Sequence, residues 1–291
     1  MNLLPFVATG IGLGAVYGMS GVGLVVLYRA SGTLNFAFGA LGAVAAHSTW
    51  QLIQYHVPVA VAWLCGVVVA ALFSWGYGRL VSSQLIDRNR SVRAIATLGF
   101  ALFLLGAVTM IWGPGLPRRL SLPTDNMVVG WLVSTTGLRL SITRVIAIAF
   151  AVGSVGGIAL LLTRTRLGLA MRSLASDRAI SSQIGISVTR VDAIAWLISG
   201  AFAGFAGLFL ADLVVMSPIP LTFLVIPAIA AAVIGRLTSM TGAFAGGLLG
   251  GFLEALLAGV PNLASVRSAA PYVMALLLIA FVARATPEAG E

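Results

Sequence analysis

The stretch LPFVATGIGLGAVYGMSGVGLVVLY, residues 4–28, has no charged side chain and carries glycine at positions 10, 14 and 18. A helix of this length measures about 37 Å, more than the roughly 30 Å hydrocarbon core of a bilayer. It is too long for the apolar core of a secretory signal peptide, and the residues before it carry no positive charge. We therefore expect a retained membrane-spanning helix.

The whole chain shares this character. Of its 291 residues, 59% are hydrophobic and 9% are charged, and the mean hydropathy is +1.06. A soluble domain has about 25% charged residues, so this chain has too few polar side chains to cover a soluble surface. The composition predicts an all-α polytopic membrane protein with one transmembrane domain, residues 1–291.

Apolar runs bounded by Arg clusters, Pro and polar stretches predict about eight or nine transmembrane helices. The seventh run is short and contains Pro227, so we expect a re-entrant or broken helix there. The predicted segments are 4–28, 34–54, 57–78, 92–112, 142–163, 193–213, 221–235, 241–259 and 270–284.

The charges predict topology rather than nucleic-acid binding. All 17 basic residues are Arg, against 8 acidic residues, and they cluster between apolar runs. Cytoplasmic loops are enriched in basic residues, which places the N-terminus outside and the C-terminus inside. The arginines expected inside are Arg29, Arg79, Arg88, Arg90, Arg93, Arg164, Arg166, Arg172, Arg178, Arg190, Arg236 and Arg284; those expected outside are Arg118, Arg119, Arg139, Arg144 and Arg267.

Redox, metal and acid–base chemistry have little support in the sequence. The single cysteine, Cys65, cannot form an intrachain disulfide. The two histidines, His47 and His56, have no acidic residue close in sequence, so neither a metal-ligand cluster nor an enzyme's acid–base set is expected.

Two segments outside the predicted spans are long enough to have structure of their own. Residues 113–141 resemble a short extracytoplasmic β-hairpin. Residues 164–192 predict two short cytoplasmic helices, Leu167 to Ala175 and Arg178 to Ile184, with Asp177 as N-cap and Gly185 as C-cap. An ordinary solvated connector would also account for this loop, but its amphipathic pattern favours a helix pair that docks onto a partner.

Glycine recurs at four-residue spacing inside the spans. Such spacing lets helix backbones approach closely in a membrane, so we expect a tightly packed, Gly-rich bundle. The candidate packing glycines are Gly10, Gly14, Gly18, Gly242, Gly246 and Gly250.

Two polar residues interrupt the apolar runs and are candidate functional groups. Asn35 lies among turn-forming residues, and the backbone groups exposed by a helix break there must line a cavity or be satisfied by other helices. Glu254 lies well inside a span, where an ionised carboxylate is costly. Two roles stay open for Glu254: it lines a pathway, or it pairs with a partner such as Arg236 or Arg267.

Three motifs occur in order along the chain. The first is Leu34-Asn35-Phe36-Ala37-Phe38-Gly39. The second is RTRLGLAMRSLASD, residues 164–177, followed by Gly185-Ile186 and Arg190-Val191. The third is AAVIG, residues 231–235, then GAFAGG, residues 242–247, and Leu253-Glu254. Together they resemble the N-F-A-H-G signature, the coupling loop and the glycine-rich C-terminal region of the branched-chain amino acid ABC-transporter permeases.

The resemblance implies the membrane subunit of an ABC importer for small amino acids of the branched-chain type, located in the bacterial inner membrane. Such a subunit is no enzyme and has no cofactor of its own, because ATP is bound by a partner. The implied partners are cytoplasmic ATP-binding subunits, an extracytoplasmic solute-binding protein, and a second permease, homologous or identical, in a dimer. The chain has no Lys and so no P-loop of its own.

The resemblance also assigns residues. It implies a substrate pathway at Asn35, Phe36, Phe38, Gly39 and Glu254. It implies an ATPase-coupling loop that contains Arg166, Gly168, Arg172, Ala175, Asp177 and Gly185.

The sequence departs from the family pattern at three places. Phe38 stands where His is usual, Ala40 where an acidic or polar residue is common, and Arg236-Leu237 where a second Gly is expected. Related permeases carry urea, short amides or sugars, so a permease for urea or short amides stays open. An ion-coupled secondary transporter also stays open, with Glu254 and Asp212 as carriers, as does a passive channel.

Overall fold

The computed structural model describes residues 4–113, 118, 120, 141–213, 216–258, 272, 273 and 276. Among these, the only β-type pairing given between two described residues is an isolated bridge from Arg118 to Met216. The elements are α1 (Leu4–Ser31), α2 (Phe38–Gln54), α3 (Val59–Leu80), the short 3-10 helix η1 (Ser82–Leu85), α4 (Arg90–Trp112), α6 (Ile142–Arg164), α7 (Arg166–Ser176), α8 (Arg178–Gln183), α9 (Val188–Leu213), α10 (Pro218–Phe223), α11 (Val225–Ile234) and α12 (Met240–Ala258).

The expected all-α polytopic membrane fold is confirmed. Within the described ranges, 6 helices are long and apolar enough to cross a membrane, namely α1, α3, α4, α6, α9 and α12. The seventh predicted segment is a broken helix, because α10 ends at Phe223 and α11 begins at Val225. The predicted hairpin at 113–141 and the predicted span at 270–284 fall almost entirely outside the described residues.

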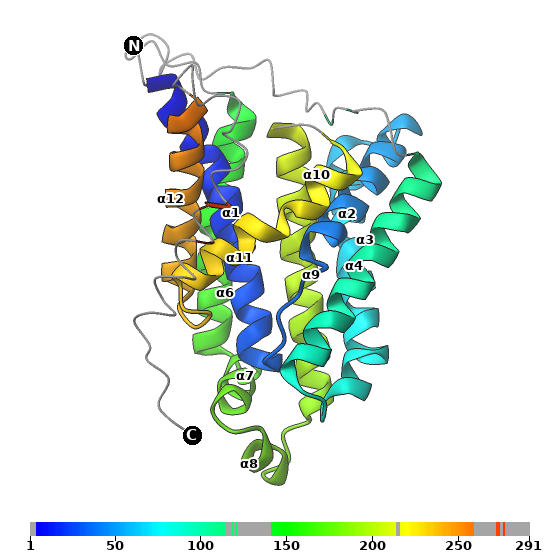
Figure 1. The fold of residues 1–291 in the computed structure, drawn as a ribbon, viewed down its shortest axis with the longest axis vertical. Helices are drawn as coiled ribbons and strands as arrows, with labels where there is room; N and C mark the ends of the chain where they lie inside the picture. The colour runs from blue at the N-terminus through cyan, green and yellow to red at the C-terminus, as the bar shows by residue number, and fades with distance from the viewer. Residues whose placement is uncertain are drawn as a thin grey trace.

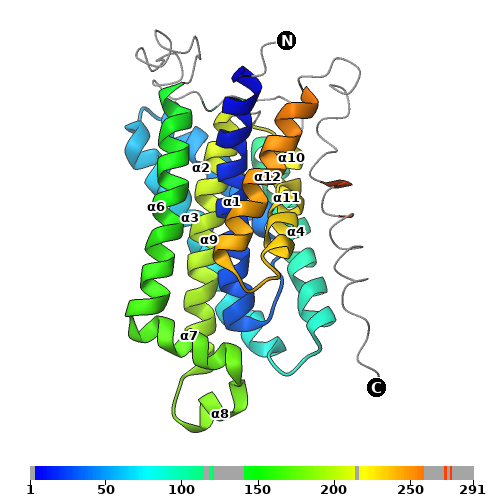
Figure 2. The same ribbon diagram turned by 90° about the vertical axis from the view of Figure 1, so that its left-hand side faces the viewer.

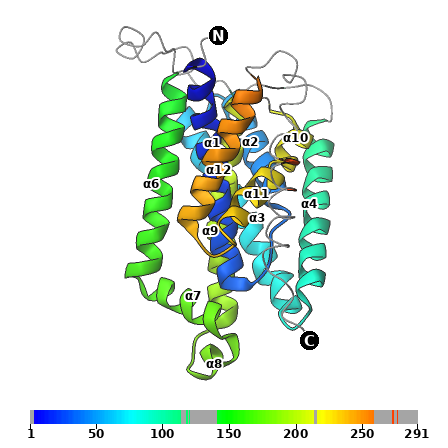
Figure 3. The same cartoon turned by 60° about the vertical axis from the view of Figure 1, so that its left-hand side comes forward.

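Helix α1 occupies the middle of the bundle (Figure 1). It packs against α12, α9, α11 and α6, while α2, α3 and α9 pack against one another. Helices α4 and α6 lie at opposite edges, with α1 and α12 between them (Figures 2 and 3). The centre is therefore built on α1.

Glycine permits the central contact. A Cβ atom added to Gly247 or Gly251 of α12 would clash with the backbone of Gly18 or Gly14 of α1, respectively. Such backbone contact is the packing expected for small residues in a membrane. The other glycines of α12 have different neighbours, since Gly246 lies against Ile234 of α11.

The described arginines gather at one end of the bundle, where α1, α3 and α6 finish and α4 and α9 begin (Figure 1). We call this the arginine-rich end. It contains α7 and α8. Two described arginines lie at the opposite end: Arg144 is in the first turn of α6, and Arg118 donates to the carbonyl oxygen of Trp112, the last residue of α4. This segregation follows the grouping expected from loop charges.

Candidate functional site

The helical structure is interrupted between α1 and α2. We call the non-helical residues 32–37 the break. Gly32 has a φ of 66°, a left-handed conformation that glycine adopts without steric cost, and α1 ends there. Residues 33–37 then run from the arginine-rich end toward the middle of the bundle (Figure 1). The Asn35 Oδ1 atom accepts the Ala37 N–H at 3.0 Å and turns the chain into α2.

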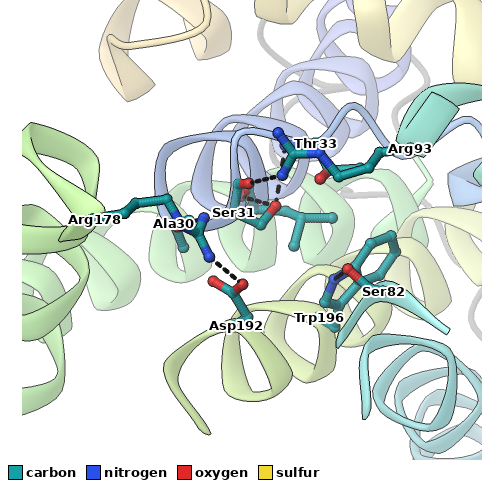
Figure 4. Close-up of polar contacts among 9 residues, drawn as sticks. Ala30, Ser31, Thr33, Ser82, Arg93, Arg178, Asp192 and Trp196 are labelled. Atoms are coloured by element: carbon teal, nitrogen blue, oxygen red, sulfur yellow. Dashed lines mark hydrogen bonds and ion pairs between the residues drawn. The ribbon is translucent and has the colours of Figure 1, made fainter. Parts of the chain in front are cut away.

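Helix α4 satisfies the backbone groups that the break exposes. Thr97 Oγ1 accepts the Phe36 N–H at 3.1 Å and lies 3.1 Å from the Leu34 carbonyl oxygen, to which it can donate. Arg93 Nη1 donates to the Ser31 carbonyl oxygen at 2.8 Å (Figure 4). The sequence predicted the need for such partners but did not identify Arg93 or Thr97.

Two buried polar atoms of the break keep unused hydrogen-bonding capacity. Thr33 is 3% exposed and Asn35 is fully buried. Thr33 Oγ1 and Asn35 Nδ2 have no hydrogen-bond partner in the part of the chain that the structure describes. Buried groups of this kind are uncommon and require an explanation.

The other predicted pathway residues of this motif lie at the end of the break and at the start of α2. Phe36 is half-buried, whereas the Phe38 side chain is fully buried and lies close to Gly23 of α1. A Cβ atom at Gly39 would collide with the carbonyl group of Thr222 in α10. The start of α2, directly after the break, thus meets the interrupted helix α10–α11 inside the bundle.

Helices α7 and α8 form the predicted coupling loop. Their bounds agree with the sequence prediction to within one residue. The Asp177 side chain caps α8 by accepting the Ile180 N–H at 3.0 Å. The C-cap is Ile184, one residue before the predicted Gly185, which follows it with a φ of 89°. Local cap chemistry therefore explains where these helices begin and end.

The loop has one buried and one exposed face. Gly168, Met171 and Leu174 are buried, and Gly168 lies against the Leu162 carbonyl of α6. Three apolar side chains face outward, Leu169 and Ile180 at 59% exposure each and Ile184 at 69%. The other residues assigned to coupling, Arg166, Arg172, Ala175, Asp177 and Gly185, are also exposed.

Arg178 connects this loop to the last turn of α1, directly before the break (Figure 4). Its Nη1 atom donates to the Ala30 carbonyl oxygen at 3.0 Å, and its Nη2 atom forms an ion pair with Asp192 Oδ2. The Asp192 side chain is 9% exposed, and such a buried carboxylate requires a charged or hydrogen-bonding partner. One guanidinium group therefore joins α8 to the end of α1 and the start of α9.

Sequence reasoning missed both members of this pair. The available signal was Asp192 itself, an acidic residue that immediately precedes the predicted span at 193–213. The prediction began that span too late, because α9 starts at Val188 and contains Asp192.

Glu254 lies in a different interface. The Tyr17 hydroxyl of α1 donates to Glu254 Oε2 at 2.9 Å. Helix α12 packs mainly against α1 and α11, whereas the start of α2 lies against α10 and the break is bonded to α4. The structure therefore brings Asn35, Phe36, Phe38 and Gly39 together without placing Glu254 among them.

One departure from the family pattern lies in the turn between α11 and α12. Arg236 and Leu237 have φ values of 53° and 57°. This left-handed region suits glycine, which is the residue that the resemblance leads one to expect there. The chain keeps the turn with two residues that carry a Cβ atom.

No group of three or more His, Cys, Asp or Glu residues able to hold a metal ion occurs within the described ranges. The chemistry available in the region of the break is hydrogen bonding and charge, supplied by Asn35, Thr33, Arg93, Arg178 and Asp192.

Comparisons with known proteins agree with this architecture. The chain is 28% identical to the high-affinity branched-chain amino acid transport system permease protein LivH of Salmonella typhimurium, over 85% of this chain and 83% of the relative. It is 28% identical to BraD of Pseudomonas aeruginosa, over 89% and 87% of the two chains. It is 30% identical to LivM of Salmonella typhimurium, over 72% of this chain and 53% of the relative.

No solved structure matches the chain. The family described as "Branched-chain amino acid transport system / permease component" matches residues 6–283. Because this match covers nearly the whole sequence, the chain belongs to the branched-chain amino acid transport system permease family.

Proposed function

We propose that the chain is the permease subunit of an ABC importer that carries a branched-chain or similar aliphatic amino acid across the bacterial inner membrane. The names of LivH, BraD and LivM support this substrate class. Separate cytoplasmic subunits bind and hydrolyse ATP, and a solute-binding protein delivers the substrate from outside. Similarity to both LivH and LivM supports a pair of permeases in the complex.

The observation that carries this proposal is the connection that Arg178 makes between α8, the last turn of α1 directly before the break, and the start of α9. The ATPase docks on the exposed apolar side chains of α7 and α8, which are Leu169, Ile180 and Ile184. When the ATPase closes, it displaces α8. Arg178 transmits that displacement to the end of α1 and the start of α9, which opens or closes the path at the break.

The solute passes beside the break. Asn35 Nδ2 offers a donor to the substrate carboxylate, and Thr33 Oγ1 offers an acceptor to its ammonium group. Phe36 and Phe38 give the path an apolar wall suited to an aliphatic side chain. These assignments also account for two buried polar atoms that the protein leaves unused.

The test is coupled transport in liposomes that contain the permease with the ATPase and binding protein that co-purify with it. The double variant Arg178→Gln with Asp192→Asn removes both charges, so neither is left buried alone. We expect leucine uptake per ATP hydrolysed to fall about tenfold, the scale of a coupling energy near 1.4 kcal/mol. Arg190→Gln, which changes an exposed arginine in the first turn of α9, is the matched control and keeps normal coupling.

Normal uptake per ATP in the double variant would contradict the role of Arg178. Leucine uptake that needs no ATPase and collapses with the proton gradient would replace the ABC assignment with secondary transport. Competition by urea or acetamide, but not by leucine, isoleucine or valine, would keep the ABC assignment and change the substrate class.

A further inference from the structure

A cavity of about 570 Å³ lies at the arginine-rich end, between the end of α1, the start of α4, the α7–α8 corner and the turn before α12. Its volume falls within the range of small-molecule binding sites. The polar side chains that line it are Tyr28, Arg29, Arg90, Ser176, Arg178 and Thr238.

The lining consists of donors and contains no carboxylate. It presents three guanidinium groups and three hydroxyl groups, and its remaining residues are apolar or glycine. Asp192 balances only Arg178, since this is the one salt bridge given for the described residues. Arg29 and Arg90 therefore have no acidic partner in the described part of the chain. The Arg29 Nη1 atom donates to the Thr238 carbonyl oxygen over a long distance of 3.4 Å.

Such a cavity selects an anion, and the arrangement favours phosphate. Arginine forks bind phosphate oxygens in pairs, and hydroxyl donors satisfy the remaining ones. The cavity also lies where α1 and α4 reach the end of the apolar bundle.

We propose that this cavity binds a phosphate group, carried either by the headgroup of an anionic phospholipid or by a soluble phosphate. Basic pockets between transmembrane helices on the cytoplasmic side have this chemistry. The site goes beyond the proposed transport function and does not depend on it. A ligand here would contact α1, α4, the α7–α8 corner and the turn before α12 at once.

The experiment measures ligand binding by the full-length protein purified with the subunits that accompany it. In the first arm, native mass spectrometry counts phospholipids retained from vesicles of phosphatidylcholine with or without phosphatidylglycerol. In the second arm, inorganic phosphate is titrated in detergent at constant ionic strength, and the thermal unfolding midpoint is followed. The test variant is Arg29→Gln with Arg90→Gln. The control, Arg88→Gln with Arg190→Gln, removes the same charge from exposed positions at the same end.

We expect the test variant to weaken binding of phosphatidylglycerol or phosphate about tenfold or more, and the control to bind like the natural protein. Binding in the lipid arm alone identifies a phospholipid, binding in the phosphate arm alone identifies a soluble phosphate, and binding in both arms identifies a phosphate site that accepts either source. Equal losses in the two variants would reduce the effect to surface attraction and overturn the proposal. It would also be overturned if neither probe bound.

Discussion

Helices α1, α4 and α6 are similar in length and apolar character, but α1 is buried in the bundle whereas α4 and α6 are largely exposed. In the apolar window of α1, 94% of residues are buried, against 22% in each of α4 and α6. All three contain several glycines. Those of α1 touch neighbouring backbones or side chains, whereas a Cβ atom added at Gly99 or Gly106 of α4, or at Gly153 of α6, would meet nothing within 4 Å. Glycine spacing alone therefore does not distinguish a packing surface from an exposed one.

The largest expected effect comes from exchanging glycine for alanine on the two kinds of surface. Gly247→Ala places a Cβ atom into the backbone of Gly18. The clash is with backbone atoms, which cannot rotate away as a side chain could, so we expect a loss of about 3 kcal/mol or more in unfolding free energy. Gly153→Ala should change it by no more than about 0.5 kcal/mol. Tryptophan fluorescence during unfolding in mixed micelles measures both. Equal losses would show that Gly153 is packed as tightly as Gly247.

A second pair of variants tests which part of α4 is held by the rest of the bundle. Thr97 bonds to the break, whereas the Thr109 hydroxyl bonds only to the carbonyl groups of Leu105 and Gly106 in its own helix. Thr97→Val leaves a buried N–H without its partner and should cost about 1 to 3 kcal/mol of unfolding free energy. Thr109→Val serves as the control and should cost less than about 0.5 kcal/mol. A loss at Thr109 as large as at Thr97 would show that α4 is anchored along its whole length.

The smallest expected effect concerns the turn that leads into α12. Arg236 is exposed and has a left-handed backbone, so Arg236→Gly should relieve steric strain and raise the unfolding free energy by about 0.5 to 1 kcal/mol relative to Arg236→Ala. Both variants remove the same charge, so their difference isolates the Cβ atom. Chemical unfolding of the two proteins side by side measures it, and a more stable alanine variant would refute the strain.

The sequence predicted features that depend on local chemistry. Apolar length located the helices, Pro227 marked the interrupted one, and Asp177 and Gly185 set the ends of α8 through capping. Each of these signals acts within a few residues of the structure it determines. Consequently, the bounds of α7 and α8 were predicted almost to the residue.

Contacts between distant segments could not be predicted in this way. Thr97 and Arg93 meet a break that lies more than 60 residues earlier, and Glu254 meets Tyr17 across 237 positions. Nothing in one sequence pairs these groups, because their proximity arises only when the bundle assembles. Arg178 was overlooked for the same reason, since its partners Ala30 and Asp192 become neighbours only in the folded bundle.

The contact between α1 and α12 has a further consequence for thermodynamics. Long side chains lose rotamer freedom when they pack, whereas glycine has no side-chain conformers to lose. The approach of Gly14 to Gly251 and of Gly18 to Gly247 therefore carries no side-chain entropy penalty from these four residues. Glycine instead gives up more backbone freedom than any other residue when a helix forms, so the entropy cost of this centre belongs to the formation of α1 and α12 and not to their packing.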